Sequence, residues 1–195
     1  MYTTNLFESF SPGIFIGRDE ELNKLEKLLI HDKEKVVTIS GNNATGKTAL
    51  WMEFLKRHKA NYDERVQVLR TSSPFRNLPE IDKKISLVVI EDISFDFNLE
   101  IEKRLIELIK RNFDKQFLLV GAHADKLKMS SVNNIHLQYF AENSSDELLN
   151  KLLKSKISPK EIQKIANLTK GNPYLLGLFS SLLNEKNIVS IKFTN

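Results

Sequence analysis

The 195-residue sequence contains no cysteine, which excludes disulfide bonds, thiol catalysis and metal sites built on thiolates. Three of its four histidines, His31, His58 and His136, lie in unrelated contexts and lack the spacing of metal ligands. The first residues show no basic stretch followed by an apolar one, and no apolar run approaches the ~20 residues that cross a bilayer. We therefore expect a cytoplasmic protein without a membrane partner.

A strong excess of charge is also absent, since 29 basic residues face 25 acidic ones and give a net charge of +4. This mild excess permits a nucleic-acid partner but does not indicate one. Hydrophobic residues make up 41% of the chain and charged residues 28%, as in an ordinary globular protein. A chain of this length predicts one α/β domain with a small appendage.

The most informative motif is the segment GNNATGKT at residues 41–48, which matches the phosphate-binding loop pattern G-x-x-x-x-G-K-[ST]. It follows an apolar run at residues 36–39 and precedes a helix-like stretch at residues 49–55. This order of strand, loop and helix directs backbone N–H groups and a helix N-terminus toward phosphate oxygens. The motif therefore predicts binding of a nucleoside triphosphate.

Each fixed position of the loop has a physical role in that binding. Gly41 and Gly46 let the backbone turn inward, so that its N–H groups face the phosphates. Lys47 would reach the β- and γ-phosphates, and the Thr48 hydroxyl would ligate Mg²⁺. The nucleotide-binding residues expected from this loop are Gly41, Asn42, Asn43, Ala44, Thr45, Gly46, Lys47, Thr48 and Ala49.

Two carboxylates, Glu91 and Asp92, follow the uniformly apolar run at residues 87–90. The carboxyl edge of a parallel strand is where ligands bind in open α/β sheets. By position Glu91 would hold the metal through water, and Asp92 would act as the base that polarises the attacking water. We therefore expect Lys47, Glu91 and Asp92 to be catalytic, and Mg²⁺ to be held by Thr48 and Glu91 together with the nucleotide.

Hydrophobic periodicity predicts the remaining elements of a domain at residues 1–140. Helices are expected at residues 19–30 and 98–112, and further strands at residues 66–71, 117–120 and 135–139. Five strands separated by helical segments predict an open parallel sheet with helices on both faces. The fold class is thus α/β, a three-layer αβα nucleotide-binding domain.

Three helices are expected next, which predicts a small helical lid at residues 141–186. Residues 144–147 read Ser-Ser-Asp-Glu and residues 158–161 read Ser-Pro-Lys-Glu, and both segments predict a capping box at a helix N-terminus. In the final segment, residues 187–195, the stretch at residues 188–193 alternates between apolar and polar side chains. They predict an edge strand.

Two further segments complete a combination typical of one family. Phe15-Ile16-Gly17-Arg18-Asp19-Glu20 precedes the first helix, and Gly171-Asn172-Pro173 separates the second and third lid helices. In this order with the phosphate loop and the acidic strand, they resemble the signal-transduction ATPases called STAND, which include the NB-ARC and NACHT groups. That family is closely related to origin-recognition-type AAA+ ATPases.

The resemblance implies a P-loop ATPase fold with the strand order 5-1-4-3-2, and ATP or ADP as the nucleotide. The segment that it places beside the adenine comprises Phe15, Ile16, Gly17 and Arg18. From the lid, Pro173 would close over the nucleotide. Bound ADP would then hold the lid closed, and exchange for ATP would favour an open, self-associating form.

The sequence departs from this family at two catalytic positions. Glu91 stands where the metal-side carboxylate is usually aspartate, and Gly121-Ala122-His123 stands where a polar sensor residue is usual. His123 either faces the γ-phosphate or is an ordinary surface histidine. We therefore expect hydrolysis to be slow or absent. The lid also lacks the arginine of many AAA+ enzymes, which favours the signalling branch.

These observations leave three functional hypotheses open. The first is a switch ATPase module that controls assembly or signalling, and that self-associates or meets a protein partner carrying the family's further C-terminal domains. The second is a DNA-associated AAA+ ATPase of the origin-binding or transposition type. The third is an interaction module that keeps ADP as a structural ligand and does not hydrolyse ATP.

Overall fold

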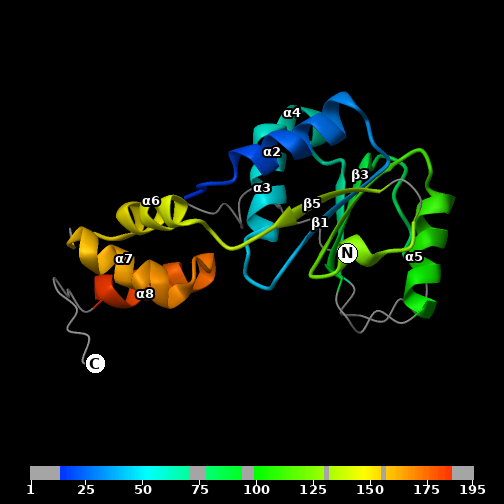
Figure 1. Cartoon of the computed structure of the whole chain (residues 1–195). Helices are drawn as coiled ribbons and strands as arrows, with labels where there is room; N and C mark the ends of the chain where they lie inside the picture. The colour runs from blue at the N-terminus through cyan, green and yellow to red at the C-terminus, as the bar shows by residue number, and fades with distance from the viewer. Residues whose placement is uncertain (1–13, 71–77, 94–98, 130–131, 155–156, 186–195) are drawn as a thin grey trace. The chain divides into compact units, whose positions relative to one another are not determined.

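The computed structural model describes residues 14–70, 78–93, 99–129, 132–154 and 157–185 (Figure 1). These residues form two compact units. The described residues of the first unit lie within 19–41 and 47–137, and those of the second lie within 14–18, 42–46 and 138–185. The chain passes from one unit to the other several times. The division predicted at residues 140 and 186 stays a prediction.

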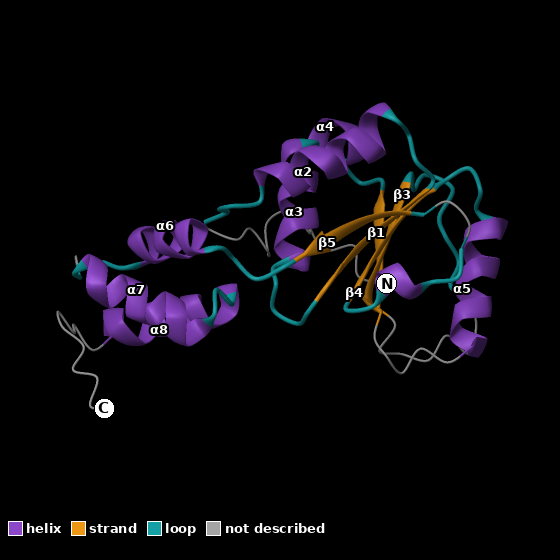
Figure 2. Ribbon diagram, viewed as in Figure 1, coloured by secondary structure: helices purple, strands orange, loops and turns teal. Residues whose placement is uncertain are grey.

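The first unit contains a sheet of five parallel strands within its described residues (Figure 2). The strands are β1 (Val36–Gly41), β2 (Val66–Arg70), β3 (Leu87–Ile93), β4 (Gln116–Gly121) and β5 (Asn133–Leu137). Their order across the sheet is β2-β3-β4-β1-β5, and each neighbouring pair is parallel. The α/β fold class and the expected order 5-1-4-3-2 are therefore confirmed.

Helices flank this sheet on both sides (Figures 1 and 2). They are α2 (Asp19–Glu26), which continues as the π-helical turn η1 (Lys27–His31), α3 (Lys47–Arg57), α4 (Lys59–Tyr62), α5 (Leu99–Arg111) and the short 3-10 helix η2 (Ala124–Lys126). Leu105 and Leu108 of α5 pack with Ile90 of β3 and Phe117 of β4. Side chains alternate between the faces of a strand, so the continuous apolar runs of β3 and β4 cover both faces of the sheet.

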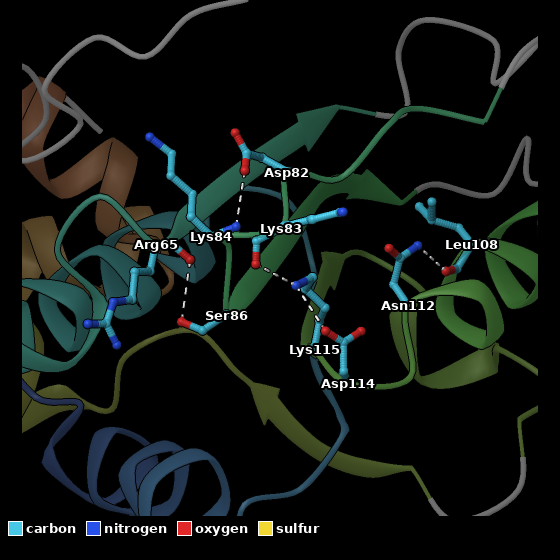
Figure 3. A network of polar contacts seen from close by, with 9 residues as sticks. All are labelled: Arg65, Asp82, Lys83, Lys84, Ser86, Leu108, Asn112, Asp114 and Lys115. Carbon is cyan, nitrogen blue, oxygen red and sulfur yellow. Dashed lines mark hydrogen bonds and ion pairs between the residues drawn. The ribbon is translucent and has the colours of Figure 1, made fainter.

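A network of polar contacts lies at the amino edge of β3 and β4 (Figure 3). The Lys115 Nζ donates a hydrogen bond to the Lys83 carbonyl at 3.1 Å and lies 3.0 Å from the Asp114 carboxylate. Nearby, the Asn112 side chain donates to the Leu108 carbonyl at 2.9 Å near the end of α5. These contacts tie the segment before β3 to the turn before β4. We call them the amino-edge network.

The second unit consists of three helices within its described part, together with residues from two earlier segments. The helices are α6 (Glu142–Leu152), α7 (Pro159–Thr169) and α8 (Pro173–Glu185). Their buried residues form one hydrophobic cluster, which comprises Leu148, Leu149, Ile162, Ile165, Leu176, Leu183 and, from the N-terminal segment, Ile16. The three expected helices are thus present and share a core.

The start of α7 agrees with the sequence, because Ser158 and Glu161 form the predicted capping box. The start of α8 agrees as well, since the Asn172 side-chain oxygen accepts from the backbone N–H groups of Tyr174 and Leu175 at 3.0 and 3.3 Å. Both motifs supply a side-chain oxygen to N–H groups that the first helical turn leaves unpaired.

The predicted capping box at the start of α6 is wrong. The helix begins at Glu142, and its N-cap residue Ala141 makes no side-chain hydrogen bond. Ser145 lies inside the helix, where its hydroxyl donates to the Ala141 carbonyl at 3.0 Å. The backbone N–H of Phe140 donates to the Gly171 carbonyl, which fixes the chain just before the helix and lets it start earlier than the serines suggested.

The last strand also lies earlier than predicted, at Asn133–Leu137 in place of residues 135–139. The reason is the pairing with β1, which runs from Val37 opposite Asn133 to Gly41 opposite Leu137. The ladder therefore ends where β1 ends. The edge strand predicted at residues 187–195 lies outside the described residues. Within the described part of the chain, no helix is long and apolar enough to span a membrane.

Candidate functional site

The phosphate loop begins at the carboxyl end of β1, where Gly41 lies against β5. A side chain at Gly41 would place its Cβ only 2.2 Å from the Leu137 carbonyl oxygen, and the residue has a φ of 136°. Only glycine fits both conditions. The loop also contains Ala44 with a φ of 62° and Gly46 with a φ of 93°. The backbone of this loop is therefore held in a conformation that most side chains disfavour.

Lys47 is the first residue of α3, and its ammonium lies back over the start of the loop. The Nζ donates a hydrogen bond to the Gly41 carbonyl at 2.8 Å. Burial lowers the pKa of Lys47 below its ordinary value of 10.5, and the charge of Asp92 offsets part of this effect. A partly desolvated cation gains stability when an anion comes next to it. This position suits the phosphate contact predicted for Lys47.

The Glu91 carboxylate joins the phosphate loop to the acidic strand. Its side chain is only 8% exposed, and its Oε1 accepts a hydrogen bond from the Thr48 hydroxyl at 3.1 Å. The same oxygen accepts from the Trp51 indole N–H at 3.1 Å, and Oε2 lies 3.5 Å from the Arg70 Nε. Two motifs far apart in the sequence therefore meet through one carboxylate. We call these four residues the Glu91 cluster.

The Glu91 cluster supplies the kind of ligands that Mg²⁺ prefers. A hydroxyl and a carboxylate are hard oxygen donors, and Mg²⁺ in nucleotide sites is held by one or two such groups and by the phosphates. Thr48 and Glu91 lie within hydrogen-bond distance of each other, so one ion could be held by both groups, directly by Thr48 and through water by Glu91. The donor set fits a nucleotide-bound Mg²⁺. Among the described residues, no group of three or more histidine, aspartate or glutamate side chains forms a metal cluster.

Asp92 differs sharply from its neighbour, because its side chain is exposed and its backbone is left-handed. Its φ is 63°, inside β3, where the pairing with β4 shifts register between Ile90 and Ile93. This irregularity turns Asp92 out of the normal alternation of the strand. Asp92 also acts electrostatically on Lys47. It thus combines a solvent-facing carboxylate with proximity to the expected phosphate contact.

His123 follows β4 and precedes η2, at the carboxyl edge of the same sheet. Partial burial and the charges of Lys126 and Lys47 lower the pKa of His123 below its ordinary value of 6.5, while Asp125 opposes this shift. The imidazole is therefore protonated to a smaller extent at neutral pH than an ordinary histidine. Because the charge of Lys47 acts on His123, the imidazole lies in the same region as the residue expected to contact the phosphates. Its role toward a nucleotide stays a prediction.

In the second unit, Arg18 links three segments of the chain. Its guanidinium donates hydrogen bonds to the Thr45 carbonyl at 3.2 Å and to the Gln138 carbonyl, and lies 4.7 Å from the centre of the Phe140 ring. Arg18 is 7% exposed. A buried guanidinium with several directed contacts fixes its surroundings. Arg18 thus holds the phosphate-loop residue Thr45.

The other residues of the predicted adenine-side segment are placed by packing in the second unit. Ile16 is buried in the core formed by the three helices, so its side chain serves the fold there. Gly17 has a φ of 63°, and a Cβ on it would lie 2.6 Å from the Ser144 hydroxyl. Phe15 is half-buried. The contact of this segment with adenine stays a prediction.

The tip of the phosphate loop is held by contacts within the second unit. The Thr45 hydroxyl donates to the Asn42 carbonyl at 2.9 Å, and the Tyr139 hydroxyl donates to the Asn43 carbonyl at 3.5 Å. Pro173 is the first residue of α8 and is half-buried. Its predicted closure over a nucleotide is untested, as is the predicted contact of Ala49.

Sequence reasoning missed Trp51 and Arg70 in the Glu91 cluster. Trp51 lies three residues after Thr48 in α3, so both side chains extend from the same face of the helix. Arg70 lies directly beside Glu91 in the register of β2 and β3. The helical spacing of Trp51 was visible in the sequence. The position of Arg70 required the strand register.

No protein-family model and no curated protein matches this sequence. Solved structures do match it. A Cdc6 protein from Pyrobaculum aerophilum has a TM-score of 0.65 at 14% identity, over 93% of this chain and 66% of that one. A STAND protein with a tetratricopeptide repeat sensor from Pyrococcus horikoshii has a TM-score of 0.59 at 18% identity, over 97% of this chain and 32% of that one.

A third solved structure, a DNA replication initiation factor, has a TM-score of 0.63 at 18% identity, over 89% of this chain and 63% of the other. The present chain therefore spans less than two thirds of the length of each of these three proteins. At such low identities the likeness shows a shared fold. The chain has the fold of AAA+ and STAND ATPases, as the motifs indicated.

Proposed function

We propose that this chain is an ATP- and ADP-binding switch ATPase module of the STAND and AAA+ type, with slow Mg²⁺-dependent hydrolysis. The hydrogen bond between the Thr48 hydroxyl and the Glu91 carboxylate is the observation that carries the proposal. It brings the expected metal ligand of the phosphate loop next to the expected metal ligand of the acidic strand. Such a pair is needed to hold Mg²⁺ on the phosphates of a nucleotide.

The residues of the chain would act on the nucleotide in distinct ways. Lys47 would bind the β- and γ-phosphates, because its partly buried ammonium gains an anionic partner there. Thr48 and Glu91 would hold Mg²⁺, which neutralises charge on the phosphates when bound. Asp92 would orient and deprotonate the attacking water from its exposed position at the carboxyl edge.

The departures from the family support slow turnover. The side chain of Glu91 is one methylene group longer than that of the usual aspartate, and its carboxylate contacts Trp51 and Arg70 in addition to Thr48. Because its pKa is lowered, His123 would offer a weak contact to a γ-phosphate in place of the usual sensor. A slow ATPase keeps each nucleotide state long enough to act as a switch. Assembly with a second copy or with a protein partner would then depend on the bound nucleotide.

Calorimetric titration with ATP and ADP tests the nucleotide site directly. Lys47→Ala is expected to weaken binding at least about 100-fold, or about 2.7 kcal/mol, because the phosphates lose their main cationic contact. Lys115→Ala is the matched control, since Lys115 is a buried lysine whose ammonium, like that of Lys47, donates to a backbone carbonyl. Unchanged ATP affinity in Lys47→Ala would show that the proposal is wrong.

Native mass measurement with ATP and with ADP tests the switch, because it reports bound nucleotide and assembly state together. We expect one nucleotide per chain, and a larger assembly with ATP than with ADP. The same assembly in both states would leave a nucleotide-binding module without a switch. Copurified ADP with no turnover would favour the third hypothesis, in which ADP is a structural ligand.

A second candidate function is a DNA-associated AAA+ ATPase. The likeness to a Cdc6 protein and to a DNA replication initiation factor favours it, and the mild positive charge of the chain permits it. Stimulation of ATP hydrolysis by duplex DNA, with a steep dependence on salt, would support this candidate. Equal hydrolysis with and without DNA would exclude it. A cytoplasmic location stays a prediction.

A further inference from the structure

The carboxylate of Glu91 has two partners of opposite character. Trp51 is 1% exposed, and its indole N–H donates to Oε1 at 3.1 Å. Arg70 has a side chain that is 64% exposed, and its Nε lies 3.5 Å from Oε2. One partner is fixed by the packing of the core and carries no charge. The other faces solvent and carries a full positive charge.

Trp51 fixes the orientation of the carboxylate. A buried indole N–H needs an acceptor, and Glu91 provides it within the core of the first unit. The same oxygen accepts from Thr48, so Trp51 and Thr48 approach Glu91 from one face of α3. An outer partner that fixes a ligating carboxylate typically raises metal affinity 10–100-fold. Trp51 is placed to do this for the longer side chain of a glutamate.

Arg70 acts on the same carboxylate through its charge. It ends β2 directly beside Glu91 in the strand register, so its backbone position is set by the sheet. A guanidinium at this distance compensates the negative charge of the carboxylate, and it repels a second cation that approaches the same group. Because Glu91 is 8% exposed, water screens this repulsion only in part. Arg70 is therefore placed to weaken the binding of Mg²⁺.

We propose that Trp51 and Arg70 are positioning residues that set the Mg²⁺ affinity of the Glu91 cluster in opposite directions. Trp51 raises the affinity by holding the carboxylate toward Thr48, and Arg70 lowers it by competing with the metal for negative charge. The proposal rests on the proposed function, because it takes Thr48 and Glu91 as the ligands of a nucleotide-bound Mg²⁺. The protein would then control its affinity for Mg²⁺ as well as its affinity for the nucleotide.

The test measures the affinity of the full chain for a fluorescently labelled ADP, first in EDTA and then during a Mg²⁺ titration. Trp51→Phe is expected to raise the Mg²⁺ concentration at half effect about 10-fold, within the range known for outer partners of metal ligands. Arg70→Gln is expected to lower it several-fold, about 3- to 10-fold. Arg70→Lys keeps the charge and is expected to stay close to the wild type.

Two matched controls separate these effects from general damage. Tyr62→Phe removes a polar contact from another buried ring, whose hydroxyl donates to the Gln116 side chain at 3.2 Å. Arg111→Gln removes an equal charge from an exposed helical pair with Glu107 on α5. Both variants are expected to leave the Mg²⁺ dependence unchanged. Circular dichroism confirms that every variant is folded before it is compared.

A second readout uses Trp51 itself, which is the single tryptophan of the sequence. Addition of Mg²⁺ to the ADP-loaded protein is expected to change its fluorescence, and in Arg70→Gln the change is expected at lower Mg²⁺. Mg²⁺ shifts of the same sign in Trp51→Phe and Arg70→Gln, or no shift in a folded Arg70→Gln, would overturn the inference. Failure of the wild type to bind ADP, with or without Mg²⁺, would instead overturn the proposed function.

Discussion

The two edges of the sheet in the first unit hold their lysines in different ways. At the amino edge, Lys115 contacts the Asp114 carboxylate at 3.0 Å and the Lys83 carbonyl at 3.1 Å (Figure 3). At the carboxyl edge, the Lys47 ammonium donates to the Gly41 carbonyl at 2.8 Å, and burial lowers its pKa. Lys115 contacts a carboxylate directly, whereas burial of Lys47 carries an electrostatic cost that the charge of Asp92 offsets in part.

The backbone shows a related difference. The amino edge has left-handed residues only in the turns that precede strands, at Lys33 before β1 and Glu64 before β2, among the described residues of the first unit. At the carboxyl edge, Asp92 is left-handed within β3 itself. Strained backbone and a desolvated charge lower stability and concentrate at functional sites. This difference supports the proposal that the carboxyl edge of the sheet binds a ligand, whereas the contacts at the amino edge stabilise the fold.

Among the variants that test this difference between the two edges, Asp92→Asn is expected to have the largest effect, and that effect is on ATP hydrolysis. Removing the base that polarises water is expected to slow ATP hydrolysis about 100-fold or more, with ATP binding changed by less than about 3-fold. Single-turnover hydrolysis and calorimetry measure the two quantities. Glu91→Gln is the comparison variant, in which Mg²⁺-dependent binding falls. A loss of binding in Asp92→Asn would show that the roles of Glu91 and Asp92 are exchanged.

The next effect concerns the amino edge alone. Lys115→Ala is expected to lower the free energy of unfolding by about 2 kcal/mol, because the Lys83 carbonyl loses its donor and the packing of the buried Lys115 side chain is lost. Thermal unfolding measures the loss, and a chain of this size should unfold several degrees lower. ATP affinity is expected to stay unchanged. An equal loss of stability and of affinity would show that the two edges are not independent.

Much of this architecture could be predicted from the sequence. The strands β3 and β4 contain continuous apolar runs at residues 87–90 and 117–120, and β1 is buried along its whole length, since parallel strands covered on both faces need no polar alternation. The strand order came only from the resemblance to a family, because an apolar run does not reveal its neighbour. The start of α6 was mispredicted, since the decisive contact joins Phe140 to Gly171, far apart in the sequence.

The residues of the candidate site likewise include some that could be proposed from the sequence and some that could not. Lys47, Thr48 and Glu91 could be proposed from local motifs, and in the structure the Thr48 hydroxyl lies 3.1 Å from the Glu91 carboxylate. Their roles toward a nucleotide stay predictions. Arg70 could not be found, because its partner depends on the register of β2 against β3. Sequence therefore identifies the groups expected to touch a ligand more readily than the groups that position them.

A smaller effect is expected when the backbone strain at Asp92 is relieved. Asp92→Gly is expected to stabilise the protein by up to about 1 kcal/mol, because glycine adopts a positive φ without the steric cost of a side chain. Hydrolysis is expected to fall as in Asp92→Asn. Glu64→Gly is the matched control, since Glu64 has a φ of 53° at the amino edge and a similar gain should leave hydrolysis intact. Destabilisation by Asp92→Gly would mean that the Asp92 side chain supports the fold.

The smallest expected effect is the uptake of a fraction of a proton when a nucleotide binds, and it tests Lys47 at the carboxyl edge directly. Because burial lowers the pKa of Lys47 below 10.5, the ligand-free native protein loses this proton at a lower pH than the unfolded chain does. The contribution of Lys47 to stability therefore rises with pH between its lowered pKa and 10.5. Phosphates bound beside the ammonium would raise its pKa again, so binding takes up a proton in that alkaline window.

Calorimetry of ADP binding in buffers with different ionisation enthalpies measures this uptake. We expect almost none at neutral pH, and a rising fraction of one proton as the pH approaches 10.5. The phosphates themselves stay fully ionised there, because their last pKa lies near ~6. Lys115→Ala should show the same uptake as the wild type, since Lys115 lies at the other edge of the sheet. Proton release in the alkaline window, or no exchange, would mean that Lys47 does not meet the phosphates.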